Sequence, residues 1–289
     1  MDFSLRRVTN ENMYYYESGK DSDIQLVFTP GSLNPDIWRH QLKYFSRNFR
    51  TISFEPTSSF KGHPGEKNAL KNVLEQDDID NAVLISHHIG NSLVQEFESH
   101  ESVAATVITG APNGNSKFFS RTVYRLLCSF GRSKPKLVKK LLFSDSTSYR
   151  VVKDFVSEIK PADYSDFKSF ISNYSLRRPF KNAMVIHAEE DRFSEIDFAK
   201  DLKGEGALSV INNAGTFCFY EKPQEFNKAL SDFLKSVEEN VEKTEVEIAK
   251  EKNRSLWDYG SKKGEESKKS SAKKKEDKKV NQQRLKVKR

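Results

Sequence analysis

Short apolar runs that alternate with helical patterns constrain the fold of this chain more than any other feature. Six runs stand out: Ile24–Phe28, Thr51–Phe54, Ala82–Ile85, Val103–Ile108, Ala183–Ile186 and Leu208–Ile211. Their near-continuous hydrophobicity is typical of strands covered on both faces, and the segments between them would supply the covering helices. The sequence therefore predicts an α/β fold with a mostly parallel sheet. Runs near Phe3–Val8 and Met13–Tyr16 would add an antiparallel edge.

The alternation stops for about seventy residues after Ile108. Residues 116–180 are basic, rich in aromatic side chains and helical in pattern. A helical excursion between two strands of one sheet usually lies over the carboxyl edge, where it can shape a pocket. We therefore expect a core of residues 1–114 and 179–238 with a helical cap insertion at 115–178. A structural extension without a ligand is the alternative.

The C-terminal part of the chain differs sharply in charge from the rest. Residues 239–260 carry a charged pattern that would form a solvated helical extension. Residues 261–289 hold 13 Lys and Arg against four Asp and Glu, a local charge of +9 in a chain of net charge +7, so residues 1–260 carry −2. This Lys-rich tail has too few apolar residues to offset chain entropy, and we predict that it is disordered. It would bind RNA or another polyanion, or only solubilise the protein.

Cysteine, histidine and glycine usage exclude several classes of site. Cys128 and Cys218 form no C-x-x-C pair and no Cys/His cluster, which argues against a disulfide framework or structural zinc. No His, Asp or Glu set has metal-ligand spacing, and no glycine-rich phosphate signature follows a strand, so we expect neither a metal nor a cofactor. We find no signal-peptide core and no apolar stretch of about 18 residues, and predict a cytoplasmic protein without a transmembrane segment.

The segment Ala82–Phe97 carries the most information about function. It reads as an apolar strand, a tight turn and an amphipathic helix, with small residues Ser86 and Gly90 placed two before and two after the middle of the turn. This segment resembles the nucleophile elbow of α/β hydrolases, in which such small residues give the strained apex room. The apex, where the family carries its nucleophile, is His88. His87, just before it, is expected to pack between helix and sheet.

The resemblance extends over approximately residues 3–235, in the family's order. Residues 28–38 are similar to the oxyanion loop, although Thr29 and Pro30 replace its His-Gly pair. Asp191 falls at the family's aspartate, and Thr216 falls where the family has its catalytic histidine. The resemblance also implies which residues would surround the oxyanion pocket: Gly31, Ser32, Ile89 and Trp38.

Triad chemistry needs a nucleophile, a base that deprotonates it and an acid that orients the base, and two of these three positions are replaced. In a serine protease, loss of such a unit lowers the rate roughly 10⁶-fold. We therefore expect a catalytically degenerate α/β-hydrolase-like protein that binds a small molecule under the cap or serves as an interaction module. Asp191 and Thr216 would then be structural turn residues.

Two other functions stay open. An active ester, thioester or amide hydrolase would use non-standard residues, with Asp191 orienting a neutral His88 as a general base toward water. A nucleic-acid-associated protein would be recruited through residues 261–289. Neither cysteine thiol is expected to be catalytic, since neither falls on the elbow.

Overall fold

The computed structural model describes part of the chain in detail: residues 4–7, 14–29, 33–55, 63–76, 79–113, 117–130, 133–158, 174, 176, 179–181, 183–244, 246–247 and 250. The chain divides into two units, residues 1–238 and residues 239–289. The sheet and every helix discussed below belong to the first unit unless stated otherwise.

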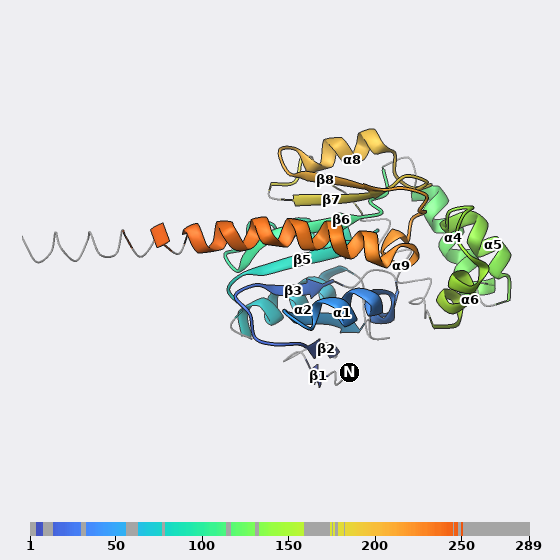
Figure 1. The fold of residues 1–289 in the computed structure, drawn as a ribbon. Coiled ribbons are helices and arrows are strands. Elements are labelled where there is room, and N and C mark those ends of the chain that lie inside the picture. Colours follow the sequence, from blue (N-terminus) through green and yellow to red (C-terminus); the bar gives the residue numbers. More distant parts are fainter. Residues whose placement is uncertain are drawn as a thin grey trace, which may run out of the picture. The chain divides into compact units, whose positions relative to one another are not determined.

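Eight strands of the described residues form one sheet in the order β1-β2-β4-β3-β5-β6-β7-β8 (Figure 1). They are β1 (Ser4–Arg7), β2 (Tyr14–Ser18), β3 (Gln25–Phe28), β4 (Arg50–Glu55), β5 (Ala82–His87), β6 (Val103–Thr109), β7 (Ala183–Ala188) and β8 (Ala207–Ile211). β1 pairs antiparallel with β2, and β2 with β4, while all other neighbours are parallel. The predicted mostly parallel sheet with an antiparallel edge is confirmed, and the six apolar runs correspond to β3 through β8.

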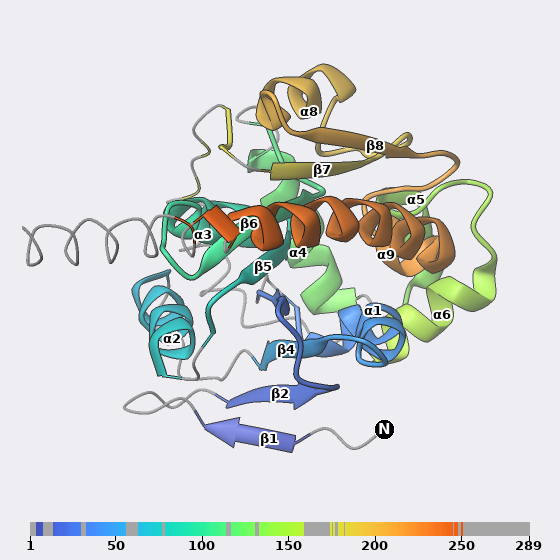
Figure 2. The same ribbon diagram turned by 60° about the vertical axis from the view of Figure 1, so that its left-hand side comes forward.

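Helices cover both faces of this sheet (Figure 2). They are the 3₁₀ turn η1 (Pro35–Trp38), α1 (Arg39–Phe45), α2 (His63–Gln76), α3 (Gly90–Phe97), α8 (Ile196–Lys203), α9 (Cys218–Glu221) and a last helix over residues 223–238. β3 and β5 are buried along their whole length. Val27 belongs to a core cluster that includes side chains of α2, α3 and α8, whereas the next residue, Phe28, contacts Trp38 with 5.3 Å between ring centroids. This alternation explains why the central strands read as continuous apolar runs.

Where the structure describes the chain between β6 and β7, it contains three further helices: α4 (Lys117–Phe130), α5 (Pro135–Leu142) and α6 (Tyr149–Glu158). They occupy most of the predicted insertion, whose exact boundaries stay a prediction. Val123 and Tyr124 of α4 line the same cavity as His87, the last residue of β5. The insertion therefore lies at the carboxyl end of the central strands, where the green helices are drawn in Figure 1.

A buried carboxylate fastens the insertion to the core. Glu221 accepts hydrogen bonds from the backbone amides of Gly215 (2.9 Å) and Ser144 (3.0 Å) and from the hydroxyl of Thr147. Close backbone packing accompanies this clamp, because a Cβ added to Gly215 would lie 2.5 Å from the carbonyl oxygen of Leu142. Only glycine admits such an approach. The α5–α6 loop is thus held in place relative to the loop that follows β8.

In the second unit, residues 239–244 are helical. The predicted disordered tail at 261–289 lies outside the described residues, so that prediction stands as it was made. None of the helices in the described part of the chain is long and apolar enough to cross a membrane.

Candidate functional site

The turn between β5 and α3 has the geometry of a strained elbow. His88 has a φ of +55°, a left-handed conformation that L residues adopt at a cost of about 1–2 kcal/mol. Its amide donates to the carbonyl of Thr109 at 3.1 Å, and its own carbonyl accepts from the amide of Asn91 at 3.2 Å. The second bond closes the first turn of α3. The chain therefore reverses abruptly from strand to helix at the residue that the sequence places at the apex.

Buried polar side chains hold this turn in place. The hydroxyl of Ser86 donates to Oδ1 of Asn91 at 2.6 Å, and Nδ2 of Asn91 donates to the carbonyl of Thr109 at 3.0 Å. On the other side, the hydroxyl of Ser92 donates to the carbonyl of Ile89 at 2.9 Å. Satisfied buried networks of this kind specify a single local conformation. The backbone at the apex is therefore fixed by side chains of β5 and α3 together with the end of β6.

His87 is a structural histidine that links β5 to the loop after β8. Its Nε2 lies 3.2 Å from the carbonyl oxygen of Thr216, and because a carbonyl only accepts, Nε2 carries the proton. Burial, followed by the neighbouring His88, lowers the pKa of His87 well below 6.5. The ring occupies space that a side chain at Gly110 would fill, since a Cβ there would lie 2.7 Å from it. His87 is therefore a neutral packing residue, as the sequence suggested.

His88 is also neutral at physiological pH. Its side chain is buried and stands edge-on to the ring of Phe193, with 5.3 Å between centroids and 86° between planes. Burial lowers the pKa of His88 to about 4. An imidazole with so low a pKa is a weak base at neutral pH.

Asp191 and Thr216 form a hydrogen-bonded pair. The hydroxyl of Thr216 donates to Oδ1 of Asp191 at 2.9 Å, and the amide of Phe193 donates to the same oxygen at 2.9 Å. Burial raises the pKa of Asp191 to about 6, although these hydrogen bonds oppose the shift. The Asp191 carboxyl group is thus engaged by a hydroxyl of the loop after β8.

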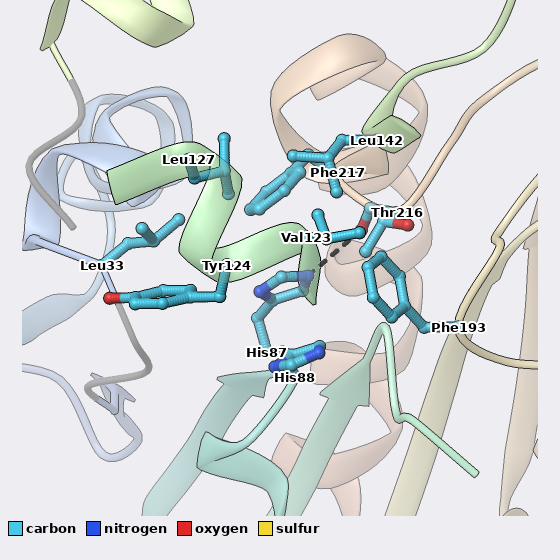
Figure 3. A pocket seen from close by; sticks show the side chains of 10 residues that line it. All are labelled: Leu33, His87, His88, Val123, Tyr124, Leu127, Leu142, Phe193, Thr216 and Phe217. Atoms are coloured by element: carbon cyan, nitrogen blue, oxygen red, sulfur yellow. Dashed lines mark hydrogen bonds between the residues drawn. The ribbon is translucent and has the colours of Figure 1, made fainter. Parts of the chain in front are cut away.

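A small cavity lies above the elbow (Figure 3). Its volume is about 30 Å³, which is room for one or two water molecules. The lining is mostly apolar and comes from the elbow, the insertion and the loops after β7 and β8: Leu33, His87, His88, Val123, Tyr124, Leu127, Leu142, Phe193, Thr216 and Phe217. The structure therefore brings His88 and Thr216 to one cavity beside Val123 and Tyr124 of α4.

Three solved structures are similar to this chain over most of its length. They are a thermophilic esterase from Thermogutta terrifontis (14% identity, TM-score 0.65, 82% of this chain and 99% of the other), a bromoperoxidase from Bacillus anthracis (16%, 0.63, 81% and 100%) and an alpha/beta hydrolase fold protein from Chitinophaga pinensis (15%, 0.65, 80% and 96%). This protein has the α/β-hydrolase fold. No model of a protein family and no curated protein matches the sequence.

The strand, the tight turn and the helix around His88 have the strand-turn-helix form from which the resemblance to a nucleophile elbow was drawn. Of the four residues predicted to surround the oxyanion pocket, the structure describes Ile89 and Trp38. Ile89 is buried at the start of α3, and Trp38 stacks on Phe219 with 4.1 Å between centroids; neither lines the cavity. Gly31 and Ser32 lie outside the described residues. Thr29, which replaces part of the family's His-Gly pair, is bonded through its amide and its hydroxyl to the carbonyl of Ile85.

Thiol and metal chemistry find no support in the part of the chain that the structure describes. Cys218 is buried, its Sγ lies 3.5 Å from the hydroxyl of Thr109, and burial raises the pKa of the thiol to about 12. It is therefore protonated at neutral pH and is a poor nucleophile. Among the described residues, no group of three or more His, Cys, Asp and Glu side chains could hold a metal ion.

Two residues that shape this site were missed at the level of sequence. Phe193 stands edge-on to His88 and donates its amide to Asp191, and Glu221 bonds the loop that carries Gly215 to the insertion. Phe193 could have been suspected because it lies two residues after the aspartate, at the usual reach of an Asp-organised turn. Glu221 offered no such signal, since its partners lie at two separate places in the chain.

Proposed function

We propose that this protein is a catalytically degenerate member of the α/β-hydrolase fold, whose helices α4 to α6 cap a pocket that no longer supports ordinary ester hydrolysis. The observation that carries the proposal is the hydrogen bond from the Thr216 hydroxyl to Asp191. A triad needs an imidazole at that place to take the proton of the nucleophile and return it to the leaving group. A threonine hydroxyl, with no comparable basicity, does neither.

The elbow residue supports the same conclusion. A general base works best when its pKa is near the working pH, whereas burial lowers the pKa of His88 to about 4. An imidazole-based hydrolase would need Asp191 to raise that pKa. The described hydrogen bonds of the Asp191 carboxylate instead come from the Thr216 hydroxyl and from the backbone amides of Phe193 and Ser194.

The size of the cavity bears on what the protein does in place of hydrolysis. Pockets for small molecules usually measure about 300–1,000 Å³, many times the roughly 30 Å³ found here. This difference favours an interaction module over a binder of a sizeable ligand. Under this proposal the hydrolase fold is a rigid scaffold, and we expect a partner to bind to the surface of the insertion.

The test is turnover of short-chain p-nitrophenyl esters by the full-length protein, with labelling by a serine-directed fluorophosphonate. We expect the wild-type rate to equal that of the His88→Ala variant, and no label at residue 88. His100→Ala is the matched control, because His100 follows α3 on the way to the amino end of β6, away from the cavity. Turnover that His88→Ala abolishes and His100→Ala preserves would refute degeneracy and establish an imidazole mechanism.

A further inference from the structure

Helices α4 and α5 also carry leucine and lysine side chains that do not line the cavity above the elbow. Half-buried Leu126, Leu137 and Leu141 border a shallow groove between the two helices, together with exposed Lys134. Lys136 and Lys140 of α5 are also exposed. We call these six residues the Leu-Lys surface.

The arrangement on α5 follows directly from helical spacing. Val138 and Leu142 of α5 are buried. Leu137 and Leu141 are four residues apart and form one row, and Lys136 and Lys140 form a second row about 100° further round the helix. A half-buried apolar row therefore runs beside an exposed cationic row along α5.

Charge in the first 260 residues is concentrated in this insertion. Residues 117–158 hold ten Lys and Arg against three Asp and Glu, a formal charge of +7. The other residues of 1–260 hold 25 Lys and Arg against 34 Asp and Glu, a formal charge of −9. Such an asymmetry orients a protein toward an anionic partner through one face.

The form of the surface discriminates between anionic partners. The groove encloses only about 10 Å³, too little to seat the side-chain anchors of a partner helix. A nucleic acid would contact the lysines through phosphates but gains nothing from leucines, because its bases stack on aromatic rings. The interface of an anionic bilayer uses both, since leucines enter the boundary of the acyl chains while lysines meet the headgroups.

We propose that the Leu-Lys surface docks this protein onto membranes that contain anionic lipids, with α4 and α5 lying against the headgroups. Docking of this kind is peripheral and reversible, because it buries a few leucines and needs no spanning helix. The inference is independent of the elbow, and it holds whether or not His88 has any chemical activity.

The test is co-sedimentation of the full-length protein with phosphatidylcholine vesicles, with and without phosphatidylserine. We expect binding only with phosphatidylserine, and weaker binding at high salt. The double change Lys136→Glu/Lys140→Glu should lower the partition coefficient by roughly 30-fold or more, since each lysine near an anionic surface contributes about a factor of five. The matched control is Lys228→Glu/Lys235→Glu, which makes the same charge change at exposed lysines of the helix over residues 223–238 and should leave binding nearly unchanged.

A second variant separates a bilayer from a polyanion. Leu137→Ala/Leu141→Ala should weaken vesicle binding by about tenfold while leaving the charge intact. Melting curves of every variant establish that it is folded. The proposal is overturned if phosphatidylserine does not increase vesicle binding of the full-length protein. It is also overturned if the Lys136/Lys140 and Lys228/Lys235 double variants lower vesicle binding equally. It is equally overturned if single-stranded RNA binds through Lys136 and Lys140 and vesicles do not.

Discussion

At the scale of single residues, His88, Asp191 and Thr216 are engaged in packing and hydrogen bonding. His88 is a buried neutral ring against Phe193, and Thr216 bonds Asp191 through its hydroxyl. The position of His88 could be predicted because the spacing of Ser86 and Gly90 is a local steric requirement. The partnership of Thr216 with Asp191 was not predicted from residue type alone, because it depends on how the loops after β7 and β8 meet in three dimensions.

The raised pKa of Asp191 gives a pH dependence with a definite sign. The folded protein binds this proton more tightly than the unfolded chain, with a pKa of about 6 against 3.8. The corresponding stability is present below about pH 4 and is lost as pH rises to about 6. Asp191→Asn has no proton to lose, so its stability relative to wild type should increase by up to about 3 kcal/mol over this window.

Urea unfolding at a series of pH values measures this difference. Asp197→Asn is a suitable control, because the exposed Asp197 pairs with Lys200 and its pKa is lowered, which reverses the sign of any trend. A relative stability of Asp191→Asn that stays flat or falls between pH 4 and 6 would mean that the Asp191 carboxyl group is better solvated than its burial indicates.

Restoring the lost residues tests whether the elbow keeps its geometry. The double change His88→Ser/Thr216→His would place a hydroxyl at the apex and an imidazole beside Asp191. We expect weak turnover of short-chain p-nitrophenyl esters in the double variant and less in either single variant, since triad members act as a unit. The measurement is the initial rate of ester hydrolysis of the three variants at equal protein concentration. Equal rates in all three would contradict the expected cooperation.

At the scale of elements, the sequence predicted the strands better than the contacts that hold the insertion. The runs that became β3 to β8 were readable because strands buried on both faces are apolar throughout. The hydrogen bonds of Glu221 could not be predicted from the sequence, because they join Ser144 and Thr147 of the α5–α6 loop to Gly215 in the loop after β8. Local patterns of hydrophobicity do not predict a hydrogen bond between loops that are distant in the sequence.

This clamp makes a prediction about stability. Glu221→Ala removes the acceptor of three hydrogen bonds and leaves the amides of Ser144 and Gly215 without it. The free energy of unfolding should fall by about 2–5 kcal/mol, because each buried donor left unsatisfied costs about 1–3 kcal/mol. The exposed Glu225 on the following helix supplies the control, and Glu225→Ala should change stability by less than about 0.5 kcal/mol. If denaturant unfolding gives the same free energy of unfolding for the two variants, the hydrogen bonds of Glu221 do not stabilise the fold.

At the scale of the whole molecule, charge is divided among three parts of the sequence. Residues 117–158 of the insertion carry +7, the Lys-rich tail at 261–289 carries +9, and the rest of the chain carries −9. The analysis of the sequence assigned all polyanion binding to the tail, since it compared the tail with residues 1–260 as one body. The basic character of residues 116–180 was also readable from the sequence; the fold adds that leucine and lysine side chains of α4 and α5 border one groove.

Deleting residues 261–289 should leave the melting temperature nearly unchanged, because the tail has little apolar surface to bury. Affinity for single-stranded RNA should fall strongly and lose most of its dependence on salt, because fewer phosphate contacts release fewer counterions. Thermal melts and RNA titrations over a salt series compare the full-length and shortened proteins. A large drop in melting temperature would show that the tail packs on the fold.

If burial alone sets the pKa of His88, the imidazole is no general base at neutral pH, and the most direct test is the pKa of His88 in solution. NMR titration of the ring carbons of His88, in the wild-type protein and in Asp191→Asn, measures it. We predict a pKa far below 6.5 that the substitution leaves unchanged, because burial sets it. A pKa near or above 7 that falls in Asp191→Asn would reveal a functional His88–Asp191 dyad and contradict the account.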